Sequence, residues 1–249
     1  MTEPLVSIIM PVYNRSHLVL NAIDSIVAQT YRKWELWILD DGSTDDTVDV
    51  IQRHTQDPRI HVIGLPHAGV AMARNAGLDR STGTYIAFLD SDDTWPAHKL
   101  ATQVNVMLTT GARVSVGYFI DRTDESDPHP FLRTCPSPLT LHHLLIDNCI
   151  LFQTLMAHHS LKSTLRFPDC RHEDYAVALR LVRQRLPLVV IEEVLTYRQR
   201  HRHSLSANKW RSALWRYRIY RDEAGLSVIS SGLYLLAYAW VSITRRPMR

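Results

Sequence analysis

Short apolar segments alternate with amphipathic segments along the first 120 residues of the chain. Apolar runs of strand length, bounded by turn residues, predict strands at residues 6–10, 35–39, 60–64 and 84–89. Apolar residues at helical spacing predict helices between them, at residues 18–30, 47–54 and 70–79. This alternation predicts an α/β fold, in which a mostly parallel sheet is flanked by helices.

The pattern changes after residue 120. Residues 121–140 are rich in Pro and Asp and are predicted to form a loop or lid. A helix with an apolar face is predicted over residues 173–185, and a strand over residues 188–191.

An acidic cluster, Asp90-Ser91-Asp92-Asp93, directly follows the predicted strand at residues 84–89. Ligands of parallel sheets bind beyond the carboxyl ends of the strands. Three carboxylates in four residues repel one another unless a cation or solvent offsets their charge. Mg²⁺ typically takes one or two carboxylates together with substrate phosphates. The cluster therefore suits a metal–diphosphate complex, and a solvated acidic turn is the alternative.

Composition narrows the function classes. A chain with 45% hydrophobic and 21% charged residues is expected to fold, and its three cysteines form no C-x-x-C pair. A disulfide framework or a zinc ribbon is therefore not expected, and a reducing cytosol is the expected compartment. Residues 1–15 lack a basic leader region, so no signal peptide is expected. A dehydrogenase is excluded, because residues 10–15 contain no glycine for a dinucleotide-binding turn.

Four segments in order resemble the family 2 glycosyltransferases of GT-A fold: residues 7–15 (SIIMPVYNR), 39–45 (LDDGSTD), 73–77 (ARNAG) and the acidic cluster. The resemblance covers roughly residues 5–205. It implies transfer of a sugar from a nucleotide-diphosphate donor, a UDP-sugar, to an acceptor hydroxyl with a divalent metal, Mn²⁺ or Mg²⁺. It also implies inversion at the sugar and a role in bacterial surface-glycan synthesis.

The resemblance also implies roles for single residues on the donor side. The residues that would line or flank the base cleft are Pro11, Val12, Tyr13 and Arg15, and Asp41 would accept a hydrogen bond from the uracil imide. Arg74 would lie near the diphosphate. Asp90 would contact the ribose, Ser91 would belong to the same nucleotide-sugar site, and Asp92 would hold the metal on the phosphates. For Asp40, Asp41 and Ser43, the alternative is that they only form a turn, and this alternative has most weight for Asp40 and Ser43.

On the acceptor side, Glu173-Asp174 opens the predicted helix at residues 173–185. The resemblance makes Asp174 the general base and gives Glu173 and Trp95 a part in acceptor binding. Ordinary helix capping is the alternative for both carboxylates. In some relatives, a His in a later segment completes the metal site. The corresponding residue here would be His201 or His203. A basic loop over the diphosphate is the alternative for that segment.

The last fifty residues differ from the rest in charge. Residues 198–249 hold eleven Lys or Arg against two Asp or Glu, whereas residues 1–100 and 101–197 are each net negative. This local excess favours a local anionic partner over general nucleic-acid binding. Residues 226–243 carry no charge and would span about 27 Å as a helix, slightly short of a bilayer core.

This uncharged stretch has two faces when drawn as a helix. One stripe is apolar: Leu226, Ile229, Leu233, Leu236, Trp240 and Ile243. The other carries hydroxyl groups: Ser227, Ser231, Tyr234, Tyr238 and Ser242. Such a helix, with basic and aromatic flanks, is typical of one that lies on an anionic membrane surface. Packing on the catalytic domain or on the partner of a homodimer is the alternative.

These features divide the chain into a catalytic domain at residues 1–205 and a basic helical tail at residues 206–249. Within the domain, residues 1–120 are expected to bind the nucleotide sugar and residues 121–205 the acceptor, a glycan or a lipid-linked glycan. The protein is expected in the cytoplasm, at the cytosolic face of the membrane. Two other functions stay open: sugar transfer to a polyprenyl phosphate, and a non-catalytic partner of another transferase that binds nucleotide sugar.

Overall fold

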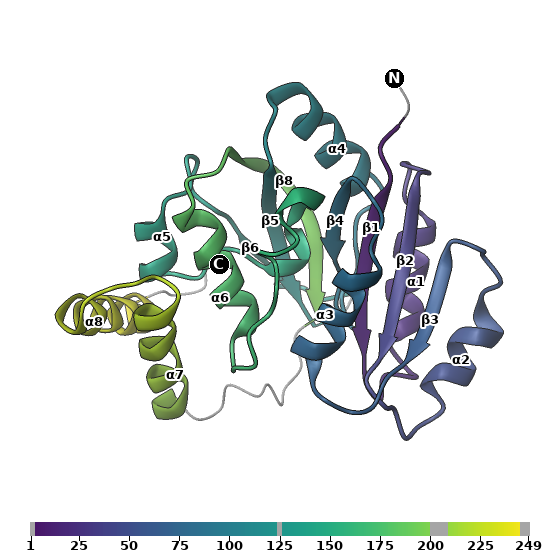
Figure 1. The fold of residues 1–249 in the computed structure, drawn as a ribbon, viewed down its shortest axis with the longest axis horizontal. Coiled ribbons are helices and arrows are strands. Elements are labelled where there is room, and N and C mark those ends of the chain that lie inside the picture. The colour runs from purple at the N-terminus through teal and green to yellow at the C-terminus, as the bar shows by residue number, and fades with distance from the viewer. Residues whose placement is uncertain (1–2, 124–125, 200–208, 245–249) are drawn as a thin grey trace.

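The computed structural model describes residues 3–123, 126–199 and 209–244 of the 249-residue chain (Figure 1). The strands are β1 Val6–Val12, β2 Trp34–Asp40, β3 Ile60–Gly64, β4 Tyr85–Phe88, β5 Val114–Arg122, β6 Phe131–Arg133, β7 Met156–His158 and β8 Leu188–Gln199. The α-helices are α1 Val19–Val27, α2 Thr47–His54, α3 Val70–Arg80, α4 Lys99–Thr110, α5 Leu141–Ile146, α6 Glu173–Arg183, α7 Lys209–Asp222 and α8 Val228–Thr244. Two short 3₁₀ helices are η1 Phe152–Thr154 and η2 His159–Leu161.

The strands form one mixed sheet in the order β3-β2-β1-β4-β7-β5-β6, with β8 paired to β5. Strands β3, β2, β1 and β4 are parallel, and β7 is antiparallel to both β4 and β5. All seven residues of β1 are buried, as expected of a central strand covered by helices on both faces. The predicted, mostly parallel α/β sheet is therefore confirmed for residues 1–120.

Two apolar cores lie on opposite faces of this sheet. Ile8 and Met10 of β1 pack with residues of α1 and α4, whereas Ile9 between them packs with residues of α3 and α6. This is the period of two that a strand buried on both faces requires. In Figure 1, α3 and α6 lie in front of the sheet and α1 lies behind it.

The structure contains β5, β7 and α5, which were not predicted, and differs from the predicted elements in three further respects. Helix α4 was not predicted, because Lys99 and Gln103 occupy inward positions beside Leu100, Val104 and Met107 and break its apolar pattern. The segment at residues 121–140, predicted as a loop, contains the end of β5 and all of β6, which pair antiparallel. Strand β8 extends to Gln199 rather than ending at Ile191.

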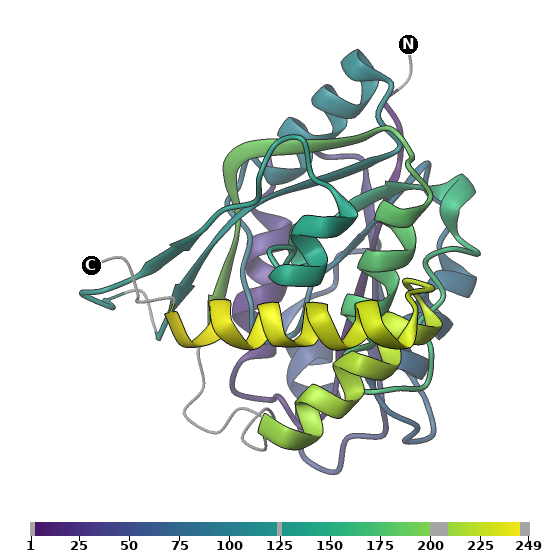
Figure 2. The same cartoon turned by 90° about the vertical axis from the view of Figure 1, so that its left-hand side faces the viewer.

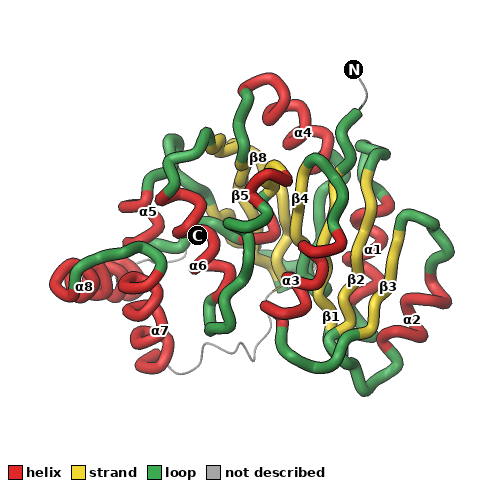
Figure 3. The backbone as a smooth tube through the Cα atoms, in the orientation of Figure 1, coloured by secondary structure: helices red, strands yellow, loops and turns green. Residues whose placement is uncertain are grey.

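The helical tail packs against α5 and α6. The Tyr220 hydroxyl of α7 donates a hydrogen bond of 2.6 Å to the Leu145 carbonyl oxygen in α5, and Tyr220 is fully buried. Figure 3 shows α5, α6, α7 and α8 gathered at the side of the sheet away from β3, and Figure 2 shows α8 lying across that side. None of the helices in the described ranges is long and apolar enough to span a bilayer.

Lys99 is a fully buried amine at the start of α4. Its Nζ donates to the Gln103 Oε1 and lies 4.0 Å from the centroid of the Trp95 ring. Burial lowers the pKa of Lys99 well below its ordinary value. Gln103 in turn donates to the Ser115 hydroxyl and the Thr154 carbonyl oxygen, each at 2.9 Å, so the buried polar groups are linked.

We predict that Lys99→Met removes a pH-dependent component of stability. The pKa of Lys99 is lower in the folded protein than in the unfolded chain, so the unfolded chain binds more protons between the two pKa values. The wild type should therefore gain stability as pH rises through this window, by at most about 1.4 kcal/mol per pH unit. The variant should lack that slope in urea unfolding from pH 7 to pH 10. The exposed Lys33→Met is the control, and identical slopes for all three proteins would contradict the prediction.

Candidate active site

The carboxyl ends of β1, β2 and β4 meet at one edge of the sheet. Val12 is in register with Asp40, and Ile9 with Phe88. The chain continues this pairing past the strands, because the Asp41 N–H donates to the Val12 carbonyl oxygen at 2.9 Å and the Leu89 N–H to that of Ile9 at 3.1 Å. The segments predicted to bind the donor therefore converge at this edge.

Asp41 holds the loop that precedes α3. Its buried carboxylate accepts hydrogen bonds from the backbone N–H groups of Ala68 at 2.8 Å and Gly69 at 2.9 Å. The His67 Nδ1 lies 3.0 Å from the same carboxylate, and the His67 ring stacks on Tyr13 with 4.4 Å between centroids. The predicted uracil contact of Asp41 stays a prediction. Its observed bonds are those of a loop anchor.

The other residues of the predicted base cleft lie at the end of β1. Pro11 and Val12 are buried within the strand, whereas Tyr13 is 40% exposed and Arg15 is exposed. The Arg15 N–H donates to the Thr47 hydroxyl at 2.9 Å, which fixes the loop after β1 against α2. For Asp40, the turn alternative has support, since its carboxylate accepts from the Ser43 N–H at 3.2 Å.

Arg74 of α3 connects the donor and acceptor segments. Its guanidinium is 5% exposed and donates from Nη2 to the Asp90 Oδ1 at 2.7 Å and from Nη1 to the Glu173 Oε1 at 2.6 Å. Burial alone would lower the pKa of Arg74, but the charges of Asp90, Glu173 and Asp174 outweigh it and raise that pKa. Three residues from three separate sequence segments thus form one buried ionic cluster.

Glu173 and Asp174 lie in the first turn of α6, and both are half-buried. Burial raises the pKa of the Glu173 carboxyl more than the charge of Arg74 lowers it. The Asp174 Oδ1 accepts a hydrogen bond of 2.7 Å from the Tyr175 N–H. The bond from Arg74 to Glu173 brings this turn to the same edge of the sheet as Asp90.

The carboxylates of the acidic cluster lie in different surroundings. Asp90 accepts from Arg74 and from the Gln153 Nε2, and Ser91 is buried. Asp93 is 3% exposed and accepts from the Gln199 N–H at 3.0 Å. Burial, together with the charges of Asp90 and Asp92, raises the pKa of Asp93 well above its ordinary value.

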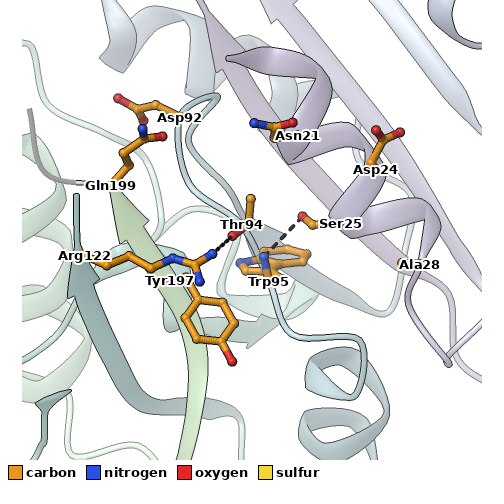
Figure 4. Close-up of a pocket in the computed structure, with 10 residues that line it drawn as sticks. All are labelled: Asn21, Asp24, Ser25, Ala28, Asp92, Thr94, Trp95, Arg122, Tyr197 and Gln199. Carbon is orange, nitrogen blue, oxygen red and sulfur yellow. Dashed lines mark hydrogen bonds between the residues drawn. The ribbon is translucent and has the colours of Figure 1, made fainter. Parts of the chain in front are cut away.

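Asp92 instead lines a cavity of about 870 Å³ on the α1 side of this loop (Figure 4). The cavity is lined by Asn21, Asp24, Ser25, Ala28, Asp92, Thr94, Trp95, Arg122, Tyr197 and Gln199. Trp95, predicted to bind the acceptor, is 4% exposed. Its backbone N–H donates to the Ser25 hydroxyl at 3.2 Å. The Arg122 guanidinium lies 4.3 Å from the centroid of the Tyr197 ring. The wall thus offers polar groups from α1, the acidic cluster and the ends of β5 and β8.

Gln153 of η1 is a site residue that the sequence analysis did not identify. Its side chain donates from Nε2 to Asp90. Its backbone carbonyl oxygen accepts from the Trp95 Nε1 and the Thr196 hydroxyl, both at 3.1 Å. It therefore ties the acidic cluster to β8. The available signal was a polar Gln-Thr pair inside the apolar run at residues 149–157.

The described residues contain no group of three or more His, Cys, Asp or Glu that could hold a metal ion. His201 and His203 lie outside the described residues. Of the three carboxylates in the acidic cluster, Asp92 is the one that lines the cavity, together with Asp24 of α1. One carboxylate fits a Mg²⁺ or Mn²⁺ ion whose other ligands are substrate phosphates and water.

Residues 7–169 match the profile of the family described as Glycosyl transferase family 2. The chain belongs to this family. The matched segment contains the carboxyl ends of β1, β2 and β4, together with Arg74 and the acidic cluster. It stops before Glu173 and Asp174 of α6.

Relatives of this glycosyltransferase are similar over almost its full length. It is 32% identical to the putative teichuronic acid biosynthesis glycosyltransferase TuaG of Bacillus subtilis, over 98% of both chains. It is also 32% identical to WfgD of Escherichia coli, over 98% of this chain and 96% of WfgD. WfgD is named a UDP-Glc:alpha-D-GlcNAc-diphosphoundecaprenol beta-1,3-glucosyltransferase.

Solved glycosyltransferases share the fold. TarS of S. aureus, in complex with UDP-GlcNAc, superposes with a TM-score of 0.73 at 18% identity, over 96% of this chain and 73% of TarS. The mannosyltransferase PcManGT of Pyrobaculum calidifontis, in complex with GDP-Man and Mn²⁺, gives a TM-score of 0.71 at 18% identity, over 98% and 77%. The predicted GT-A fold is therefore confirmed.

We predict that Arg74→Met destabilises this glycosyltransferase by about 3 kcal/mol at pH 7, since it removes the opposite charge from the partly buried carboxylates of Asp90 and Glu173. The loss should be smaller at pH 5, where the raised pKa of Glu173 favours its neutral form. Urea unfolding at both pH values measures this.

The control is Arg80→Met, which removes an exposed Arg from the same helix and should cost less than about 0.5 kcal/mol. Equal stability of the two variants at pH 7 would contradict the structural role assigned to Arg74.

Proposed function

We propose that this protein transfers a hexose or N-acetylhexosamine from a UDP-sugar, with inversion, to a hydroxyl of a lipid-linked glycan in bacterial surface-polysaccharide synthesis. The observation that carries the proposal is the Arg74 bridge, which joins Asp90 beyond β4 to Glu173, the neighbour of Asp174. A group for the donor and a group for the acceptor are thereby held at one edge of the sheet.

The choice of donor and acceptor classes has support from the relatives. WfgD and WfaP of Escherichia coli are both named for UDP-Glc and for an acceptor GlcNAc on diphosphoundecaprenol. TarS is solved with UDP-GlcNAc, whereas PcManGT is solved with GDP-Man. A uridine nucleotide and a lipid-linked acceptor are therefore preferred for this chain.

On the donor side, we assign Asp92 to a divalent metal, Mn²⁺ or Mg²⁺, because it is the carboxylate of the acidic cluster that lines the cavity. A bound metal would neutralise the charge that develops on the leaving diphosphate. Asp90 would keep one orientation for the ribose, since Arg74 and Gln153 hold its two carboxylate oxygens. Ser91 has no separate role in this proposal beyond its place in the loop.

On the acceptor side, we assign Asp174 as the general base. It would take the proton from the acceptor hydroxyl while the oxygen attacks the anomeric carbon and the bond to the diphosphate breaks. Attack on the face opposite the leaving group inverts the anomeric centre. Glu173 would orient the acceptor and keep this turn of α6 against Arg74, and Trp95 would complete the acceptor side.

Two other functions make different demands on the same residues. Transfer to a polyprenyl phosphate would not need a base, because a phosphate oxygen is already ionised at neutral pH. A non-catalytic partner would need neither Asp92 nor Asp174. A screen of nucleotide sugars with lipid-linked glycan, polyprenyl phosphate and no acceptor separates the three.

We predict that Asp92→Ala abolishes divalent-dependent release of UDP while the protein stays folded. Asp92 is half-buried at the cavity wall and lies outside both apolar cores, so its truncation should leave the packing of the sheet intact. Nucleotide release with and without EDTA measures the effect, and the exposed Asp49→Ala in α2 is the control. Wild-type activity of Asp92→Ala, or full activity of the wild type in EDTA, would contradict the assignment of Asp92 to the metal.

We predict that Asp174→Asn lowers kcat by about 10²–10⁴-fold and leaves the donor KM nearly unchanged, because general-base catalysis contributes that much and the donor does not depend on it. Steady-state rates with a saturating acceptor measure both constants. Asp169→Asn, an exposed carboxylate five residues earlier, should behave as the wild type. A rise in donor KM with unchanged kcat would instead make Asp174 a donor-binding residue.

A further inference from the structure

The outer face of α8 is apolar and exposed. It consists of Ile229, Leu233, Leu236 and Trp240, which are 77%, 63%, 70% and 70% exposed. Their spacing of four, three and four residues puts them in one stripe along the helix. Large apolar side chains that gather on one exposed face mark a site of interaction with a partner or a membrane.

The opposite, inner face of α8 holds the helix on the protein. Ser231 is fully buried, and the Tyr234 hydroxyl lies 3.0 Å from the His142 Nδ1 of α5. The guanidinium of Arg216, in α7, lies 3.6 Å from the centroid of the Tyr238 ring. Leu235 packs on the core from the same side, so the inner face combines hydroxyl-bearing and apolar contacts, whereas Ile229, Leu233, Leu236 and Trp240 face outward.

An ordinary surface helix leaves polar residues on its outer face. Helix α8 packs Tyr234 and Leu235 on the core, yet its outer face carries four large apolar side chains. Contacts of Tyr234 with Tyr220 and His142, and of Tyr238 with Arg216, fix the helix in this orientation. Exposed apolar area on this scale is unfavourable in water. It is favourable where the outer face meets another apolar phase or surface.

The charges around α8 favour an anionic membrane as that surface. Residues 226–244 contain no charged side chain, whereas Arg218 and Arg221 of α7 are exposed. In sequence, Arg245, Arg246 and Arg249 follow the helix. A second copy of the chain would bring another strongly basic tail against this one, and like charges would repel. An anionic lipid surface is attracted instead.

The dimensions of α8 suit a helix that lies along a membrane. Its 17 residues make a rod of about 25 Å, and it does not meet the length and hydropathy of a spanning helix. Trp240, near its C-terminal end, carries a ring of the kind that prefers the interface between headgroups and acyl chains. Buried apolar area and attraction to anionic headgroups together set the strength of such binding.

We propose that the outer face of α8, with the exposed Arg218 and Arg221, docks this glycosyltransferase on an anionic leaflet. The helix lies in the interface plane, with Ile229, Leu233, Leu236 and Trp240 among the acyl chains. This inference deepens the proposed function, since it places the enzyme at the surface that holds a lipid-linked acceptor. It can be tested without any sugar transfer.

The test is flotation of the full chain with two kinds of vesicle, phosphatidylcholine alone and phosphatidylcholine with 30 mol% phosphatidylglycerol. The wild type should float with the anionic vesicles, and higher salt should weaken but not abolish this. A triple variant, Ile229→Ser with Leu236→Ser and Trp240→Ser, should partition at least about tenfold less. Arg218→Gln should lower partition on anionic vesicles about fivefold, the effect of one basic residue.

The matched control is Leu108→Ser in α4, which removes a side chain that is 58% exposed on another helix and should not change flotation. Wild-type partition by the triple variant, or equal wild-type binding to both vesicles, would overturn the proposal. A wild-type dimer that the triple variant converts to monomer, with flotation unchanged, would overturn it in favour of a second copy. Donor turnover in solution is measured in parallel. If the wild type floats but does not turn over the donor, the sugar-transfer proposal is refuted and the membrane-docking proposal stands.

Discussion

A single buried guanidinium holds the two sides of the candidate site together. Arg74 has almost no contact with solvent, and an ion in that position is tolerated only with good partners. Its two partners, Asp90 and Glu173, lie 16 and 99 residues away in sequence and in different layers of the fold. The ion pairs form only when α3, the end of β4 and the start of α6 are all in position. Folding of the sheet and assembly of the site are therefore the same event.

The acidic cluster shows how such an arrangement manages charge. From the sequence, three carboxylates in four residues called for a cation or solvent to offset their repulsion. In the structure, Asp90 is neutralised by Arg74, and the raised pKa of Asp93 favours its neutral form. Asp92 is the carboxylate of the cluster that lines the cavity. A cluster of like charges is thus divided between the structure of the loop and the wall of the cavity.

The sequence predicted what depends on local pattern and missed what depends on tertiary contact. The buried runs of β1 and β2 and the motif residues at their ends could be identified, because strand patterning and motif order are properties of the chain itself. Helix α4 was missed because Lys99 and Gln103 occupy inward positions, which the bonds of Gln103 to Ser115 and to the Thr154 carbonyl oxygen make tolerable. Gln153 lies in no motif, and its role exists only through Asp90 and Trp95, which are brought to it by the sheet.

For the tail, too, the sequence predicted the pattern of the helix but not its orientation on the protein. The two stripes of α8 are visible in the sequence, but which of them faces the protein is not, since either could pack on it. The structure turns Ser231, Tyr234 and Tyr238 inward, where Arg216 and His142 meet the two tyrosines. Hydroxyl groups on the inner face can be satisfied by such partners, whereas the large apolar side chains of the outer face are mostly exposed. A helix fixed in this orientation is unfavourable for a protein in water alone, and it becomes favourable beside a lipid surface.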